Sequence, residues 1–204
     1  MDSAVALVQT YLRVNGYFTV CEYPIVELRG GFQAATDMDV LAFRFPGAER
    51  VVPGEDERRR RRHARFQVDP VLHVPADHPD MIVGEVKEGT AEFNRAGRRP
   101  DVLAAALARF GCCSGDAAQT LADELVSSGR AETPHGHAVR LVAFGSAVGG
   151  GHEPYLRVPL GHVTRFLEAW IEEHWAVMRH TQLKDPVLAF LVALAKARRG
   201  MKEA

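Results

Sequence analysis

The segment DMIVGEVKE, residues 80–88, decides how this chain folds and where its chemistry lies. Its apolar first half predicts a buried strand over residues 81–86. Its second half places a carboxylate, Glu85, and an ammonium group, Lys87, two residues apart. Because residues i and i+2 of a strand point to one face, these two side chains project side by side while Val86 turns back into the core. We therefore expect a strand that ends in a paired acid and base.

A second apolar strand with acidic residues lies upstream, over residues 35–45. It contains the run VLAF, residues 40–43, which is apolar on both faces and predicts a central strand covered on both sides. Asp37 and Asp39 lie on one face of this strand. We interpret Asp39 as the functional acid and Asp37 as a residue that caps the adjoining turn. Two strands with clustered acids and one lysine suggest a metal-dependent phosphodiesterase site.

Composition is that of an ordinary soluble globular protein. The 204 residues are 47% hydrophobic and 25% charged, which is enough for one domain with its own core. The formal net charge of -1 does not attract a polyanion to the protein as a whole, so nucleic acid would need a local basic patch.

Three cysteines are too few for a disulfide framework, which favours a reducing compartment. With no signal-peptide pattern and no apolar run of about 20 residues, we expect a cytoplasmic protein without a membrane partner.

The periodicity of the rest of the chain predicts helices around these strands. Helices are predicted at 3–14, 99–110, 116–128, 163–174 and 185–199, and strands at 17–28, 35–45, 81–86, 137–144 and 155–158. The first three strands form an antiparallel meander and the fourth follows a helical crossover. The expected fold class is α/β, with a central mixed β-sheet flanked by helices.

The same pattern predicts the organisation of the chain. We expect one domain over residues 1–204, with an Arg-rich insertion at 46–79 between the second and third strands. A C-terminal helical segment is expected at 159–200, with Asp185 and Pro186 as the N-cap and first residue of its last helix.

The acids and the lysine together resemble the PD-(D/E)XK nuclease superfamily, which has the restriction-endonuclease-like fold. The resemblance rests on Asp39 on one strand and Glu85, Val86 and Lys87 on the next, and it covers residues 3–170 as an order of elements. It implies hydrolysis of DNA with Mg²⁺ or Mn²⁺, in which Asp39, Glu85 and the Val86 carbonyl bind the metal. It also implies that Lys87 orients the attacking water or stabilises charge in the transition state.

Two features depart from the pattern of the superfamily. Its first motif appears here as Met38-Asp39, without proline. The literal pair Pro79-Asp80 lies about 16 Å from Glu85 along the same strand, so we interpret it as unrelated to the site. Where many members carry a glutamate on the first helix, this chain offers Gln9, and a third acid would come from Glu22 or Glu27. We take Glu22 as the auxiliary catalytic acid.

Basic residues are candidates for nucleic-acid binding. One group is the run Arg58, Arg59, Arg60, Arg61 and Arg62 in the insertion. The other is Arg95, Arg98 and Arg99, together with the polar residue Asn94, after the strand that carries Glu85. The alternative for both groups is a solvated, charge-balanced surface. The triplet His135-Gly136-His137 is interpreted as a tight hairpin rather than a metal site, and the pair Cys112-Cys113 as apolar packing at a helix end.

Two functions from different classes follow from these observations. The first is a Mg²⁺- or Mn²⁺-dependent endo- or exonuclease that acts on DNA, with RNA left open, in a role such as DNA repair or phage defence. The second is a catalytically degenerate protein of the same fold that acts in nucleic-acid binding or protein assembly. The apolar helix after Asp185 leaves open a homodimer or another protein partner.

Overall fold

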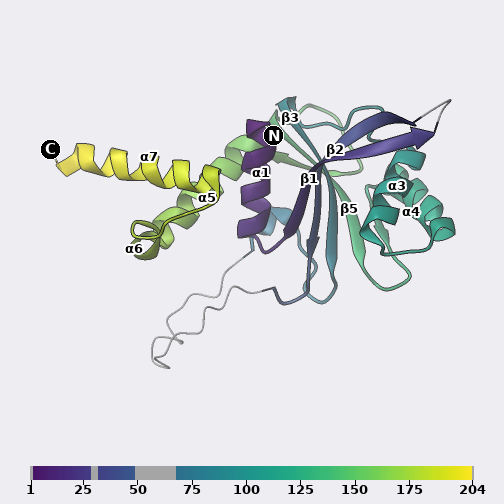
Figure 1. Ribbon diagram of the computed structural model, residues 1–204, viewed down its shortest axis with the longest axis horizontal. Coiled ribbons are helices and arrows are strands. Elements are labelled where there is room, and N and C mark those ends of the chain that lie inside the picture. Colours follow the sequence, from purple (N-terminus) through teal and green to yellow (C-terminus); the bar gives the residue numbers. More distant parts are fainter. Residues whose placement is uncertain (1, 29–31, 49–67, 204) are drawn as a thin grey trace.

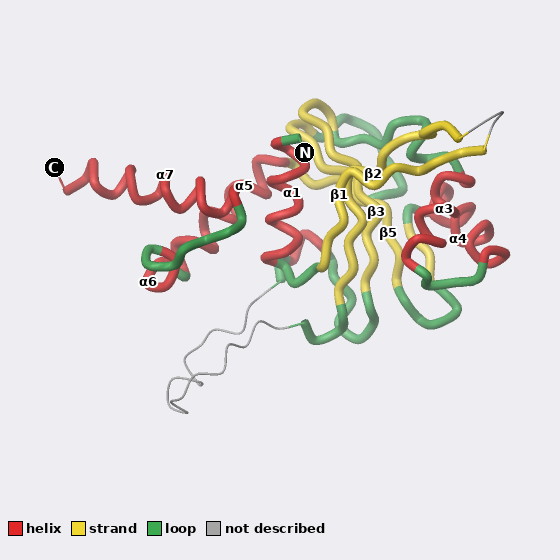
Figure 2. The backbone as a smooth tube through the Cα atoms, in the orientation of Figure 1, coloured by secondary structure: helices red, strands yellow, loops and turns green. Residues whose placement is uncertain are grey.

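The computed structural model describes residues 2–28, 32–48 and 68–203. Within these ranges a six-stranded mixed sheet lies between two layers of helices (Figures 1 and 2). The strands are β1 (Phe18–Leu28), β2 (Phe32–Arg44), β3 (Asp80–Thr90), β4 (Arg130–Glu132), β5 (Ala138–Ala147) and β6 (Leu156–Pro159). The helices are α1 (Ser3–Val14), η1 (Pro70–Leu72), α3 (Pro100–Phe110), α4 (Gly115–Ser128), α5 (Leu160–Glu173), α6 (Trp175–Met178) and α7 (Pro186–Glu203).

The sheet has the strand order β1-β2-β3-β5-β4, with β6 also paired to β5. The first three strands are antiparallel neighbours. After β3 the chain crosses over through α3 and α4, and β5 pairs with β3 in parallel. The prediction of an α/β fold with a meander and a crossover strand is therefore confirmed.

The two faces of the sheet carry separate cores. On one face α1 and α5 pack on the sheet, and Val8 and Leu12 contact a cluster that includes Val40 and Ala42. On the other face α3 and α4 pack on Leu41 and its neighbours. Alternate residues of β2 thus enter opposite cores, which confirms that this strand is covered on both sides.

Several element boundaries differ from the predicted ones. Strand β3 runs to Thr90, so Glu85 and Lys87 do not end it as predicted. Strand β5 runs to Ala147, although the predicted strand ended at residue 144. The extension forms because the N–H of Ala91 donates to the Ala147 carbonyl at 2.8 Å. Gly145 allows this approach, since a Cβ there would lie 2.4 Å from the Ala91 nitrogen. The start of helix α4 also differs from the predicted helix at 116–128, which would have Asp116 at its N-cap: Ser114 accepts the capping hydrogen bond instead.

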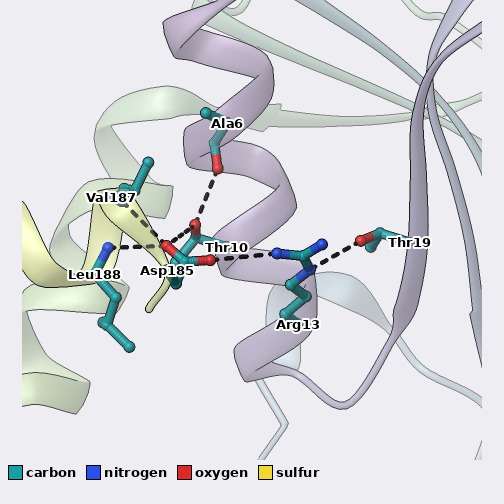
Figure 3. Close-up of polar contacts among 7 residues, drawn as sticks. All are labelled: Ala6, Thr10, Arg13, Thr19, Asp185, Val187 and Leu188. Atoms are coloured by element: carbon teal, nitrogen blue, oxygen red, sulfur yellow. Dashed lines mark hydrogen bonds and ion pairs between the residues drawn. The ribbon is translucent and has the colours of Figure 1, made fainter. Parts of the chain in front are cut away.

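The C-terminal helix α7 extends away from the sheet (Figure 1), and polar contacts join its first turn to α1. Asp185 caps it as predicted, because its Oδ1 accepts hydrogen bonds from the N–H groups of Val187 and Leu188. The same carboxylate contacts α1 through the Thr10 hydroxyl at 2.9 Å and Arg13 at 3.4 Å (Figure 3). One acidic residue therefore both starts α7 and joins it to the body. None of the helices described has the length and apolar content needed to cross a membrane.

Candidate active site

The candidate site lies where β2 and β3 stop pairing. Their antiparallel ladder runs from Arg44 opposite Asp80 to Val40 opposite Gly84. One step further, the register would set Asp39 opposite Glu85, but the ladder has ended. Instead, the backbone N–H of Val86 donates to Asp39 Oδ2 at 2.7 Å. The Asp39 carboxylate thus supplies the acceptor that the neighbouring strand no longer provides.

Glu85 is almost completely buried, with 2% of its side chain exposed. Its Oε1 lies 2.5 Å from Lys87 Nζ and accepts a hydrogen bond from Asn94 Nδ2 at 2.8 Å. Its Oε2 is buried and has no hydrogen-bond partner among the described residues. The predicted side-by-side placement of Glu85 and Lys87 is confirmed, while a fully solvated ion pair at the strand end does not fit the burial of Glu85.

The charges of the site are coupled. Burial raises the pKa of Asp39, and the Val86 N–H and the Lys87 charge offset this only in part. Burial also raises the pKa of Glu85, against the hydrogen bond from Lys87, and the neighbouring charge of Asp39 raises it further. Burial lowers the pKa of Lys87, but its bond to Glu85 and the charges of both acids outweigh burial and leave the pKa raised. Two acids that resist ionisation thus stand beside one stabilised cation.

The oxygen atoms of the site fit a hard divalent cation. Such an ion takes carboxylate and carbonyl oxygens, and Mg²⁺ in particular uses one or two carboxylates with waters and phosphate oxygens around them. Glu85 Oε2 is a buried oxygen that lacks a partner, and Asp39 lies opposite on the neighbouring strand. A strand residue points its N–H and C=O to the same neighbour, so the Val86 carbonyl faces the side of Asp39. In the described ranges, no three His, Cys, Asp or Glu side chains are grouped to hold a metal.

Glu22 lies beside this site but is engaged elsewhere. The β1–β2 register sets Cys21 opposite Val40 and so places Glu22 opposite Asp39. Glu22 has the left-handed φ of 51°, which is uncommon for a residue other than glycine. Its Oε1 accepts a hydrogen bond from the backbone N–H of Asp2 at 3.0 Å. The side chain of Glu27 lies outside the described part.

Asp2 is a residue of this region that sequence reasoning missed. Its side chain caps α1 by accepting from the Ala4 N–H at 2.6 Å, and its charge contributes to the raised pKa of Asp39. The signal was an acidic residue directly before the predicted helix at 3–14, which is the N-cap position.

Gly97 was also missed, and Asn94 was predicted only as a candidate phosphate contact, not as a partner of Glu85. Both lie in the loop between β3 and α3, where Asn94 Oδ1 accepts from the Gly97 N–H at 2.6 Å while Nδ2 donates to Glu85. The asparagine three residues before a glycine was a turn signal that could have been read. Only the tertiary structure shows that this turn lies against Glu85.

The predicted phosphate-binding arginines have different environments. Arg95 is exposed and directly follows Asn94, so it lies next to the site. Arg98 pairs with Glu153 at 3.5 Å and lies over the Tyr155 ring, and Arg99 pairs with Asp101. The run from Arg58 to Arg62 lies outside the described residues.

Asp80 belongs to a separate, buried network at the start of β3. Arg140 donates to both of its carboxylate oxygens, at 2.8 Å and 2.6 Å, and the Tyr17 hydroxyl donates to Oδ2. Its polar contacts are thus internal to the protein, in agreement with the interpretation of Pro79-Asp80 as unrelated to the site.

The other two candidate motifs have structural roles. His135 and Gly136 lie in the hairpin turn before β5, where Gly136 has a φ of 75° and its N–H donates to the Thr133 carbonyl. Cys112 is buried, and burial raises the pKa of its thiol to about 12, so it packs as an apolar residue.

Comparison of this chain with protein-family models, with curated proteins and with solved structures found no match.

Proposed function

We propose that this protein is a Mg²⁺- or Mn²⁺-dependent nuclease that hydrolyses phosphodiester bonds of DNA, with the restriction-endonuclease-like fold of the PD-(D/E)XK superfamily. The observation that carries the proposal is Glu85, a buried carboxylate with one oxygen bound to Lys87 and Asn94 and the other without a partner among the described residues. Asp39 stands opposite it, where β2 and β3 part.

A buried oxygen without a partner is costly, because burial removes water and no hydrogen bond replaces it. Native structures contain few such groups, and a bound ion is one of the explanations for those that occur. Here the unpartnered oxygen belongs to an acid whose pKa burial raises, and a second acid with a raised pKa lies nearby. A divalent cation would relieve both costs at once.

Each residue of the site has a definite task in this proposal. Asp39, Glu85 and the Val86 carbonyl hold the cation, and the Val86 N–H keeps the Asp39 carboxylate in orientation. When bound there, a cation would supply positive charge for the scissile phosphate and would lower the pKa of a bound water. Lys87, whose raised pKa keeps it protonated, orients the attacking water or stabilises the negative charge that grows on the phosphate.

Cleavage assays test the proposal directly. Supercoiled plasmid, linear duplex and single-stranded DNA, with a matched single-stranded RNA, are incubated with Mg²⁺ or Mn²⁺ or with a chelator. Wild type is compared with Asp39→Ala, Glu85→Gln and Lys87→Ala, and Asp123→Asn removes an exposed acid of α4 as the matched control. We expect metal-dependent cutting of DNA by wild type and by the control alone.

Full cleavage by Lys87→Ala would overturn the mechanism. Cutting of RNA but not DNA would keep the site and change the substrate. If no protein cuts any substrate but wild type binds DNA in a salt-sensitive manner, the second function, a catalytically degenerate nucleic-acid-binding protein, is favoured.

A further inference from the structure

We infer that Asn94 and Gly97 are positioning residues that hold Glu85 so that its free oxygen is available to a divalent cation. The inference rests on the proposed function. It assigns a role to the loop after β3, which carries none of the proposed metal ligands. The role concerns affinity for the metal and not the chemical step.

Asn94 determines which oxygen of Glu85 is free. Its Oδ1 accepts from the Gly97 N–H, so the orientation of its amide is fixed and Nδ2 must face Glu85. The resulting bond to Oε1, with Lys87 on the same oxygen, leaves Oε2 as the atom without a partner. A neutral donor suits this task, because it holds Oε1 without adding positive charge that would repel a cation.

Gly97 keeps the space beside that oxygen. A Cβ at position 97 would lie 3.2 Å from Glu85 Oε2 and 3.3 Å from Asn94 Oδ1, which is tighter than ordinary contact. Gly97 is not among the described glycines with a positive φ, so alanine there strains no backbone and its effect reports the lost space. Asn94 and Gly97 thus act on the two oxygens of one carboxylate.

The test is the affinity for Mn²⁺, measured by calorimetry on the full chain without DNA. The variants are Asn94→Ala, Gly97→Ala and Glu85→Gln. The control for the first is Ser114→Ala, which also removes a side-chain acceptor of a backbone N–H, at the start of α4. The control for the second is Gly115→Ala, at a glycine with nothing near its missing Cβ. Metal-free melting temperatures are recorded for all, so that loss of folding is separated from loss of binding.

We expect Asn94→Ala to bind Mn²⁺ about 10- to 100-fold more weakly than wild type, as is usual when a hydrogen-bond partner of a metal ligand is lost. Gly97→Ala should also bind more weakly, and both controls should bind as wild type does. If Glu85→Gln abolishes binding while Asn94→Ala and Gly97→Ala bind like wild type, the inference is overturned and the proposed function stands. If wild type neither binds Mn²⁺ nor cuts DNA, both are overturned.

Discussion

Asp39 Oδ2 accepts a 2.7 Å hydrogen bond from the backbone N–H of Val86 at the point where the β2–β3 ladder ends. A side chain of one strand thereby replaces the backbone acceptor that the strand has ceased to supply. The contact orders the acid, and it keeps Asp39 close to Glu85 although the charge of Asp39 raises the pKa of Glu85. The hydrogen bond to Val86 thus favours this placement of Asp39, and the proximity of the two acids opposes it.

The raised pKa values of the two acids predict that the stability of the metal-free protein depends on pH. The pKa values of Asp39 and Glu85 are raised by folding, so the stability contributed by their protonated forms is present below about pH 4 and is lost as pH rises through the folded values. Asp39→Asn removes one of these titrations and keeps an acceptor for Val86. The free energy of unfolding of Asp39→Asn minus that of wild type should therefore become larger between pH 4 and pH 7. Urea denaturation with a chelator measures this difference. A difference that stays constant, or falls, contradicts the prediction.

The variant Lys87→Met tests whether Lys87 acts in cleavage or in metal binding. Lys87 repels a cation at the acids, so its removal should leave affinity for Mn²⁺ unchanged or higher, while cleavage falls by about 100-fold or more. Calorimetry and a plasmid-cutting assay measure the two effects. A parallel loss of affinity and cleavage would instead assign Lys87 the task of ordering Glu85.

Asp80→Asn should destabilise the protein without altering the site. Asp80 is fully buried and bound by Arg140 and Tyr17, and removing one partner of a buried ion pair costs roughly 3 kcal/mol. Urea denaturation measures the loss, and the folded variant should retain wild-type affinity for Mn²⁺. A variant of unchanged stability that has lost metal binding would place Asp80 in the site.

Arg95→Ala should weaken DNA binding through one phosphate contact. Because Arg95 is exposed next to Asn94, its loss should lower affinity several-fold and reduce the salt slope of binding by about 1. Fluorescence anisotropy at several salt concentrations measures both quantities. Arg130→Ala, which removes an exposed arginine of β4, is the control, and an equal effect of the two changes would exclude a local contact.

Asp185→Ala should loosen α7 from α1. The change removes an N-cap together with the contacts to Thr10 and Arg13, and an N-cap alone contributes about 1 kcal/mol. Hydrogen exchange should become faster over residues 186–203 while the strands keep their protection. Unchanged exchange in α7 would show that its apolar contacts and its ion pairs with α5, Arg198 with Glu168 and Arg199 with Glu172, suffice to hold it.

Local patterns predicted much of the fold for identifiable reasons. The apolar run before Glu85 and the two-residue spacing to Lys87 are enough to set a buried strand and a shared face, because alternation along a strand needs no information from elsewhere in the chain. The Asp185 cap and the turn at Gly136 were predictable in the same way. Strand β4 was missed because three residues are too few to show a period.

By itself, the sequence determined the order of the longer elements, the mixed sheet and the pairing of Glu85 with Lys87, since each follows from periodicity and short-range stereochemistry. Only the tertiary structure decided where β2 and β3 stop pairing, and this brings Asp39 to the Val86 N–H. It also decided that the loop after β3 lies against Glu85, and this brings Asn94 to Oε1. The physical reason is that the end of a ladder and the docking of a loop depend on how two distant cores pack, and no local pattern along the chain records that packing.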